Sequence, residues 1–245
     1  MPMNEADGNM YPWVTNTHCH HRGRCGYGCT YCYTQHMRSK RFYQGPMRLV
    51  DKELKESYGS GKTIFIDHMI DLFADSIPAE NIKRVLAHCR QYPDNTYVFQ
   101  TRNPTRAYAF YLMTDEQDES LFPEDFIVGT TIETNRRDLT RHYSKAPDPE
   151  ARAWGMSWLD APKQTFVTIE PIMDFDLTYF VGLLRQTQKD FINIGADSKH
   201  QNLPEPSKAK TLQLIDALRE CGYDVRLKAN LGRIIGESKL KELST

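Results

Sequence analysis

The sequence predicts an α/β fold: a partial to nearly closed barrel of six or seven β/α units, related to the TIM barrel. Short apolar runs rich in β-branched and aromatic residues alternate with helical segments of about 10 to 15 residues. This alternation favours a parallel sheet with right-handed crossovers. Polar residues follow each apolar run, as expected where functional side chains collect at the carboxyl ends of barrel strands. We expect residues 1–245 to form one domain.

The elements follow in order along the chain. Residues 1–24 hold few periodic cues and are interpreted as a lead-in arm and a first strand, which run into a cysteine-rich loop at 18–36. Later strands are expected at Thr63–Asp67, Tyr97–Thr101, Phe126–Thr130, Phe166–Ile169, Phe191–Ile194 and Asp224–Leu227. Helices are expected at Thr34–Lys40, Pro78–Gln91, Pro104–Met113, Asp176–Gln188 and Ser207–Cys221, with a broken helical segment at Asn135–Trp158 and a short helix from Glu237.

Three cysteines stand in a C-x3-C-x2-C pattern at Cys25, Cys29 and Cys32, with Tyr31 directly before the last. Three thiolates this close in sequence indicate one metal centre. They leave a 4Fe-4S cluster one ligand short, because each iron takes its own cysteine when the protein alone closes the site. The fourth iron stays open, and an open position distinguishes a catalytic metal site from a structural one.

With its aromatic residue at Tyr31, this pattern resembles the signature of the radical S-adenosylmethionine (SAM) superfamily. The resemblance implies that SAM chelates the open iron through its amino and carboxylate groups. One electron from the cluster then cleaves SAM to methionine and a 5'-deoxyadenosyl radical, which abstracts a substrate hydrogen. It also implies an external one-electron reductant, such as flavodoxin or ferredoxin, as a partner.

Other metal chemistry stays open for the same segment. Histidines and a further cysteine surround the motif, at His18, Cys19, His20, His21 and His36. A zinc site would suit a non-catalytic nucleic-acid-binding protein, although no second ligand pair follows at C-x2-C or H-x3-H spacing. A redox C-x-x-C made of Cys29 and Cys32 would leave Cys25 without a role.

Charge and composition indicate the cellular compartment and the kind of partner that we expect for the protein. The six cysteines come without a signal peptide or an apolar run long enough for a membrane, so we expect a reduced, cytoplasmic protein. Net charge is −1, yet no Asp or Glu occurs from Gly8 to Val50, where Arg38, Lys40 and Arg41 lie among aromatic residues. Such a stretch suits DNA, because cations bind phosphates and rings stack on bases. Alternatively, its charge offsets the anionic cluster and the SAM carboxylate.

Polar residues at the expected strand ends supply the remaining candidates. By the resemblance, Asp67, His68 and Met69 would hold the SAM amino group, although the common Gly-Gly-Glu sequence is missing there. Tyr31 joins the SAM site, Thr130 and Glu133 would meet the SAM ribose and carboxylate, and Glu170 would face SAM or substrate. The candidates for substrate are Arg102, Asp197, Lys228 and Asn230, together with Arg38, Lys40 and Arg41. For each residue, a helix cap or a loop salt bridge is the alternative role.

A closer resemblance covers roughly residues 60–230. The segments Ile64–Phe73, Phe99–Pro104 and Phe166–Ile172 are similar to the phage-associated family of short radical SAM proteins. Phage thymidine hypermodification includes a radical SAM step that rearranges a glycine attached through nitrogen to the thymine methyl carbon. The resemblance therefore implies an isomerase of glycinyl-thymidine in phage DNA, located in the host cytoplasm. A DNA-repair lyase resembling spore photoproduct lyase, or a tRNA- or peptide-modifying enzyme, is the alternative.

Overall fold

The computed structural model describes residues 3–8, 10–36, 40–160, 163–187 and 189–244. Within them the main sheet has eight strands in the order β1-β2-β5-β6-β7-β8-β9-β10. The strands are β1 (Asn4–Glu5), β2 (Asn16–His18), β5 (Thr63–Ile66), β6 (Thr96–Thr101), β7 (Phe126–Thr131), β8 (Gln164–Ile169), β9 (Phe191–Ile194) and β10 (Asp224–Leu227). From β2 to β10 every neighbouring pair is parallel, while β1 is antiparallel to β2. The predicted parallel α/β sheet is confirmed.

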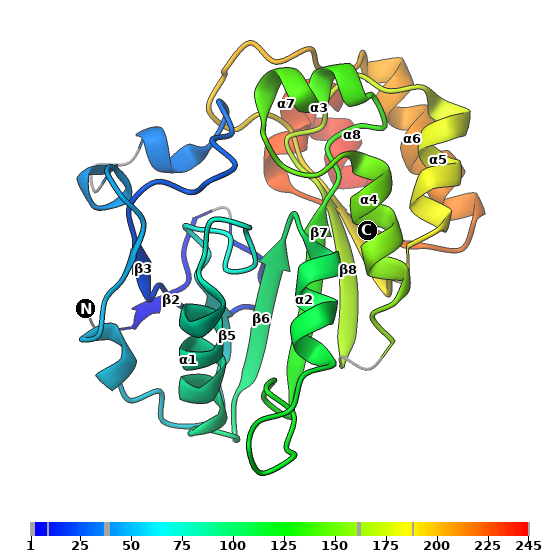
Figure 1. Cartoon of the computed structure of the whole chain (residues 1–245). Helices are drawn as coiled ribbons and strands as arrows, with labels where there is room; N and C mark the ends of the chain where they lie inside the picture. Colours follow the sequence, from blue (N-terminus) through cyan, green and yellow to red (C-terminus); the bar gives the residue numbers. More distant parts are fainter. Residues whose placement is uncertain (1–2, 9, 37–39, 161–162, 188, 245) are drawn as a thin grey trace.

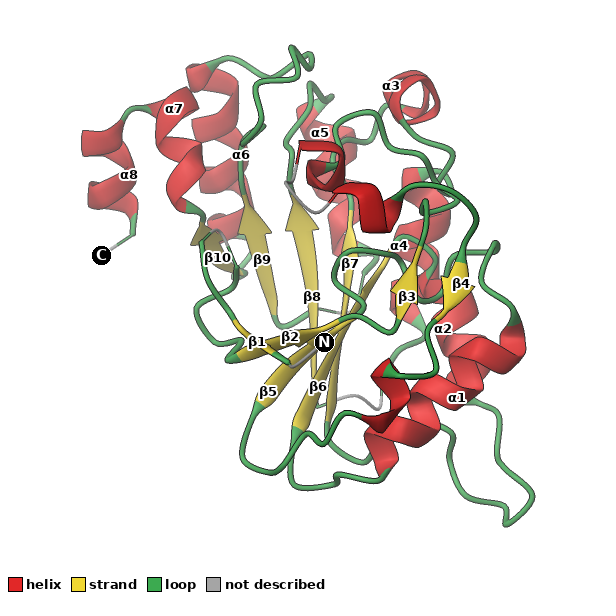
Figure 2. Ribbon diagram, turned by 90° about the vertical axis from the view of Figure 1, so that its left-hand side faces the viewer, coloured by secondary structure: helices red, strands yellow, loops and turns green. Residues whose placement is uncertain are grey.

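Helices cover the outer face of this curved sheet (Figure 1). The helices are α1 (Ala79–Arg90), α2 (Pro104–Tyr111), α3 (Arg137–Tyr143), α4 (Pro149–Ser157), α5 (Leu177–Arg185), α6 (Lys208–Glu220), α7 (Gly232–Ile235) and α8 (Glu237–Leu243). Of these, α3 lies beyond the carboxyl ends of the strands and not on the outer face (Figure 1 and Figure 2). The helical segment expected around residues 135–158 is divided into α3 and α4, and Pro149 opens the first turn of α4. Two short 3-10 helices, η1 (Tyr33–His36) and η2 (Lys40–Tyr43), stand where a helix was expected from Thr34; residues 37–39 of that prediction lie outside the described residues.

Side chains alternate between the two faces of the sheet, as the two-residue period of a strand requires. On β5, Ile64 and Ile66 pack outward with the helices, while Phe65 joins an inner cluster. On β8, Val167 and Ile169 pack outward and Phe166 packs inward. The residues that follow each strand in the inward register therefore face the barrel interior.

The lead-in arm fills the lower part of this interior. The ring of Tyr11 stacks on that of Trp13 with centroids 5.2 Å apart, and Trp13 meets Phe166 and Phe191 edge to face. The Tyr11 hydroxyl reaches Thr168 Oγ1 at 2.7 Å and Gln100 Oε1 at 2.9 Å. Figure 2 shows β1 and β2 in front of the open side of the sheet. Among the described strands the sheet does not close, because β1 and β10 are its two edges.

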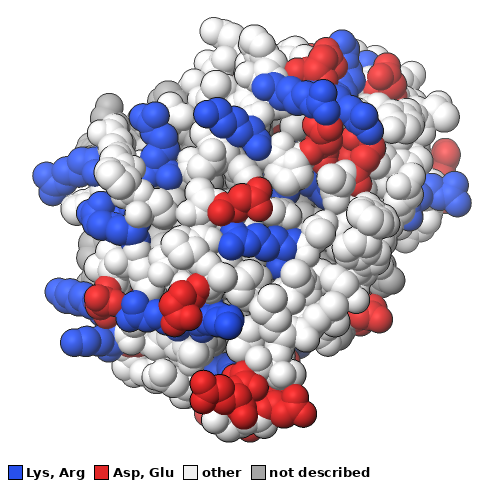
Figure 3. All heavy atoms as spheres, in the orientation of Figure 1, with Lys and Arg blue, Asp and Glu red and all other residues white. Residues whose placement is uncertain are grey.

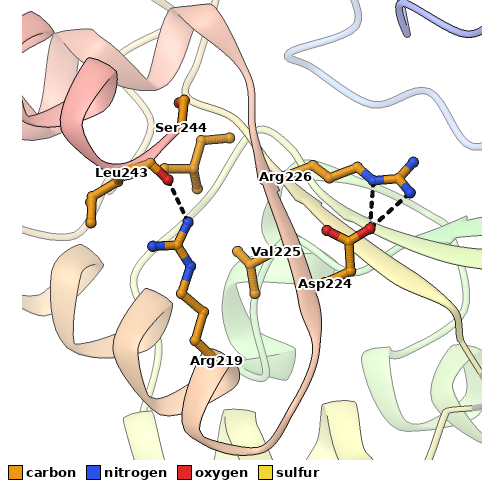
Figure 4. Close-up of a pocket in the computed structure, with 7 residues that line it drawn as sticks. Arg219, Asp224, Val225, Arg226, Leu243 and Ser244 are labelled. Carbon is orange, nitrogen blue, oxygen red and sulfur yellow. Dashed lines mark hydrogen bonds and ion pairs between the residues drawn. The ribbon is translucent and has the colours of Figure 1, made fainter.

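One pocket lies at the amino-terminal end of β10, away from the strand ends that carry the candidate residues. Its lining includes Arg219, Asp224, Arg226 and Leu243 (Figure 4). Its charged groups are satisfied internally, because Arg219 donates to the Leu243 carbonyl at 2.6 Å and Arg226 pairs with Asp224. We therefore place the candidate site at the opposite end of the sheet. None of the helices among the described residues combines the length and apolar character needed to cross a membrane.

Candidate active site

The three motif cysteines lie on one loop beyond β3 (His21–Arg22), and this loop is held from two sides. On one side the backbone N–H groups of Asp71 and Tyr27 act on the Cys25 thiol and partly offset the rise of its pKa on burial. On the same side Gly26 lies directly against Ser76, so a Cβ at Gly26 would come within 2.7 Å of the Ser76 Cβ. On the other side, the segment after α3 is bound by backbone hydrogen bonds from Thr30 N–H to the Tyr143 carbonyl and from Lys145 N–H to the Tyr27 carbonyl, at 2.9 and 2.8 Å.

Two of the three motif sulfurs lie within hydrogen-bonding distance of a hydroxyl group. Cys29 Sγ lies 3.1 Å from the hydroxyl of Ser144, and Cys32 Sγ lies 3.1 Å from that of Thr34. Burial, with Asp71 adding to it, raises the pKa of the Cys25 thiol to about 11. A thiolate ligand there forms by loss of a proton when metal binds.

The donor set, three thiols, is of the kind that holds an iron-sulfur cluster. Across the described residues, no three His, Cys, Asp or Glu side chains are grouped as ligands for one metal ion. A cluster does not require three side chains that converge on one metal ion, because each of its irons takes its own cysteine. Three cysteines on one short loop, with Cys25 and Cys32 half-buried and Cys29 buried, supply three such ligands.

Tyr31 connects the loop to a buried charge network. Its hydroxyl donates to Glu133 Oε1 at 2.6 Å, and Arg102 donates to the same oxygen at 2.7 Å. Arg152 binds the other oxygen of Glu133 at 2.7 Å, and both of these side chains are buried. Burial alone would raise the pKa of Glu133, but the two guanidinium groups and Tyr31 hold it well below its usual range. The structure thus brings together Tyr31, Arg102 and Glu133 from the predicted set.

Asp67 sits in left-handed backbone, with φ of 50°, directly after β5. Its carboxylate accepts the N–H groups of His20 and His21, and it lies 2.9 Å from His21 Nδ1. His20 Nε2 in turn lies 3.2 Å from His88 Nδ1 and 2.8 Å from the Tyr58 hydroxyl. This buried network fixes the chain that enters the cysteine loop. Direct contact of Asp67 with SAM stays a prediction.

The neighbours of Asp67 lie closer to the loop. The Tyr33 hydroxyl, next to Cys32 in sequence, donates to the His68 carbonyl at 2.9 Å and lies 3.2 Å from Met69 Sδ. His68 Nδ1 is 3.3 Å from Cys19 Sγ. By contrast, Thr130 is buried and donates to the Thr101 carbonyl at 2.7 Å, which leaves its hydroxyl proton engaged in the sheet.

Glu170, Lys228 and Asn230 meet at the carboxyl ends of β8 and β10. Lys228 Nζ lies 2.7 Å from Glu170 Oε2, and Asn230 Nδ2 donates to Glu170 Oε1 at 2.7 Å. Gly195, after β9, leaves the room they occupy, because a Cβ there would lie 2.7 Å from Glu170 Oε1. The Lys228 ammonium stands 4.9 Å from the centroid of the Tyr11 ring.

The other predicted substrate residues lie elsewhere. Asp197 is buried and caps its own loop, accepting N–H bonds from Lys199 at 3.0 Å and from Gln201. Arg41 is exposed, with its guanidinium over the Phe42 ring. Arg38 lies outside the described residues, and the side chain of Lys40 is not described either.

Sequence reasoning missed Arg152, Ser144 and Tyr11. Arg152 lies on α4 and Ser144 just after α3, within a helical segment that offered no strand end. Tyr11 belongs to an arm with few periodic cues. Its aromatic neighbour Trp13 was the one available sign of burial.

Comparison with known proteins places the fold in a class. The chain shares the fold of spore photoproduct lyase: one variant matches with a TM-score of 0.60 at 9% identity, over 91% of this chain and 79% of that one. A second structure, of spore photoproduct lyase with bound AdoMet (SAM) and dinucleoside spore photoproduct, matches with a TM-score of 0.53 at 11% identity. That match covers 87% of this chain, which spans 63% of the lyase chain.

The family is narrower than the fold. The model of the DUF5131 family, described as "protein of unknown function", matches residues 10–178, and the chain belongs to this family. No curated protein matches the sequence.

Proposed function

We propose that this protein is a radical SAM enzyme that acts on a modified thymidine in DNA. The observation that carries the proposal is the cysteine loop: three thiols on one loop beside the carboxyl ends of barrel strands, joined through Tyr31 to Glu133 and Arg102. Cys25, Cys29 and Cys32 would hold a 4Fe-4S cluster. When bound, the cluster supplies the electron that cleaves SAM to methionine and a 5'-deoxyadenosyl radical.

The chain's own residues would bind and orient the reactants. Arg102 is held by two bonds to Glu133, and its side chain is 20% exposed, so it offers a fixed cation toward the barrel interior. The Tyr31 hydroxyl stays protonated because burial raises its pKa. It can therefore keep donating to Glu133 and hold the loop in place.

The proposed substrate is glycinyl-thymidine, in which the radical step moves the glycine from nitrogen to α-carbon attachment. The sequence resemblance to the phage-associated family supports it. A basic surface also supports DNA: Figure 3 shows Lys and Arg gathered at the upper left, where Figure 1 draws the segment around β3. Arg24, Arg41 and Arg48 are exposed in this segment. A base inside a duplex is unreachable, so the enzyme would act on single strands or flip the nucleotide out.

A second candidate is a radical SAM lyase that repairs a thymine lesion. It is favoured by the shared fold with spore photoproduct lyase, one structure of which holds dinucleoside spore photoproduct.

An anaerobic assay of SAM cleavage distinguishes these two functions. Protein reconstituted with iron and sulfide is given SAM and reductant, with DNA carrying glycinyl-thymidine, DNA carrying spore photoproduct, or unmodified DNA. Formation of 5'-deoxyadenosine that is lost in Cys29→Ala and stimulated by glycinyl-thymidine supports the isomerase, and stimulation by the lesion supports the lyase. Zinc in place of iron, with no SAM cleavage, would overturn both.

A further inference from the structure

The ion pair of Glu170 and Lys228 lies at the carboxyl end of the sheet and is not sealed in the core. The Lys228 and Glu170 side chains are 13% and 16% exposed. A ligand can reach an ion pair only where part of both side chains is exposed, and this pair meets that condition. The pair therefore combines a fixed geometry with access for a small group.

Its surroundings fix both charges in position. Asn230 holds one oxygen of Glu170 at 2.7 Å and is itself anchored, because its amide also donates to the Ala196 carbonyl at 2.9 Å. The ring of Tyr11 lies below the Lys228 ammonium. Preorganised charges of this kind bind a ligand without first losing side-chain freedom.

The pair faces the same interior as the cysteine-loop network. Burial raises the pKa of Tyr11 and the charge of Glu170 adds to this, while the charge of Arg102 lowers it. At the floor of the barrel the Tyr11 ring lies 4.9 Å from Lys228 Nζ, and its hydroxyl lies 2.9 Å from Oε1 of Gln100, which stands two positions before Arg102 on the same chain segment. A group bound at Glu170 and Lys228 would sit across that floor from Arg102 and Tyr31.

We propose that Glu170 and Lys228 form the subsite for an α-amino-acid group of the substrate, which deepens the proposed function and rests on it. An α-amino acid carries an ammonium and a carboxylate two bonds apart, and this subsite presents the opposite charges with their atoms 2.7 Å apart. The substrate carboxylate pairs with Lys228 and the substrate ammonium pairs with Glu170. Each partner uses a remaining hydrogen-bonding site for this, so the internal ion pair is kept and two intermolecular charge-assisted hydrogen bonds are added.

The test uses three single-stranded oligonucleotides whose binding to the SAM-loaded holoenzyme is measured by fluorescence anisotropy. One carries N-glycinyl-thymidine, one replaces its amine by an ether oxygen, and one replaces its carboxymethyl group by methyl. We expect the wild type to bind the complete group about tenfold or more tightly than either analogue, since each analogue leaves one charged partner unmatched.

Variants of the two residues then show which one recognises the carboxylate and which one recognises the ammonium. Lys228→Met should erase the preference over the analogue without a carboxylate and retain the other preference, whereas Glu170→Gln should do the reverse. The matched control is the Lys163–Asp125 pair, at 2.8 Å and at the opposite ends of β7 and β8. Lys163→Met should keep both preferences.

Two outcomes overturn the subsite: equal binding of all three oligonucleotides by the wild type, or unchanged preferences in both folded variants. If one variant does not fold, the other variant and the wild-type analogue series decide together. The proposed function is judged separately by 5'-deoxyadenosine formation from SAM. If no 5'-deoxyadenosine forms but the wild type still prefers the complete group, the radical chemistry is rejected. If SAM is cleaved but all three oligonucleotides bind equally, the subsite is rejected.

Discussion

The Ser144 hydroxyl oxygen lies 3.1 Å from the sulfur of Cys29, across 115 positions of sequence. The same oxygen accepts the backbone N–H of Ala146 at 3.1 Å, so its own proton is available to a Cys29 thiolate. The loop after α3 thus both positions the cysteine loop and supplies it with a hydrogen-bond donor.

Removing this donor should lower the reduction potential of a reconstituted cluster. Hydrogen bonds to cluster sulfurs stabilise the more negative, reduced form. Ser144→Ala is expected to lower the potential by roughly 40 to 60 mV, the equivalent of about 1 kcal/mol for one electron. A redox titration followed by electron paramagnetic resonance measures it, with Ser157→Ala on α4 as control. An unchanged potential in Ser144→Ala would contradict the assignment.

The contact between Gly26 and Ser76 should control assembly of the cysteine loop. Gly26→Ala places a methyl group against the Ser76 side chain, so the loop must shift and we expect iron incorporation to fall several-fold. The double variant Gly26→Ala with Ser76→Gly should restore it, because the Ser76 Cα lies 4.0 Å from the added carbon. Iron and sulfide content per chain is the measurement. Failure of the second substitution to rescue would show that another strain is responsible.

Arg152 should be required for stability. It is fully buried and holds Glu133, and removal of one partner of a buried ion pair costs about 3 to 5 kcal/mol. We expect Arg152→Met to lower the free energy of unfolding by about that amount in urea denaturation. Arg137→Met, which removes a half-exposed pair with Glu150, should cost less than about 1 kcal/mol. Equal losses in the two variants would contradict the buried network.

The order of elements was predictable because local pattern and global fold agree in this chain. The runs at Thr63–Ile66 and Phe191–Ile194 are β-branched or aromatic and fully apolar apart from Thr63 and Asn193, as strands covered on both faces require. The short pairing of β3 with β4 (Arg48–Leu49) was not predicted, because two-residue strands carry no period. The lead-in arm was likewise expected only as an arm, since its aromatic residues gain their role from distant partners such as Phe166.

The structure brings some of the predicted strand-end residues together, whereas the loops direct others away. Glu133, Glu170 and Lys228 continue the inward register, where Glu133 pairs with Arg102 and Glu170 pairs with Lys228. Asp67 and Asp197 also follow strands, yet their loops turn the carboxylates onto backbone N–H groups. The conformation of each loop sets the direction of its carboxylate, and the periodicity of the sequence does not indicate that direction. Arg152 was missed because a lone cation on an outer helix is usually solvated, and its burial depends on Glu133.

Stability should fall on acidification below neutral pH. Burial lowers the pKa of His20 to about 3 and that of His68 to about 4. Unfolded histidine titrates near 6.5, so this contribution is fully present above about pH 6.5 and is lost as pH falls toward the folded values. At pH 5 His20 alone should cost about 2 kcal/mol. Urea denaturation at several pH values measures this: His20→Gln should flatten the profile, and His200→Gln, at an exposed position, should not.

The exposed cations near the cysteine loop should set the salt dependence of DNA binding. Joint change of Arg24, Arg41 and Arg48 to Ala removes charges from a segment without acidic residues, so fewer counterions are released on binding. For single-stranded DNA we expect the slope of log affinity against log salt to fall by about 2, with SAM cleavage retained.

The matched control for this variant changes Lys83, Lys208 and Lys241 to Ala, which removes the same charge from exposed positions on α1, α6 and α8. Its slope should stay at the wild-type value, because these three positions lie outside the Gly8–Val50 segment that carries the basic surface. A joint change of Arg38, Lys40 and Arg41 tests the residues first predicted from the sequence. Equal slopes for all three variants would show that net charge governs binding and would remove the DNA surface from this segment.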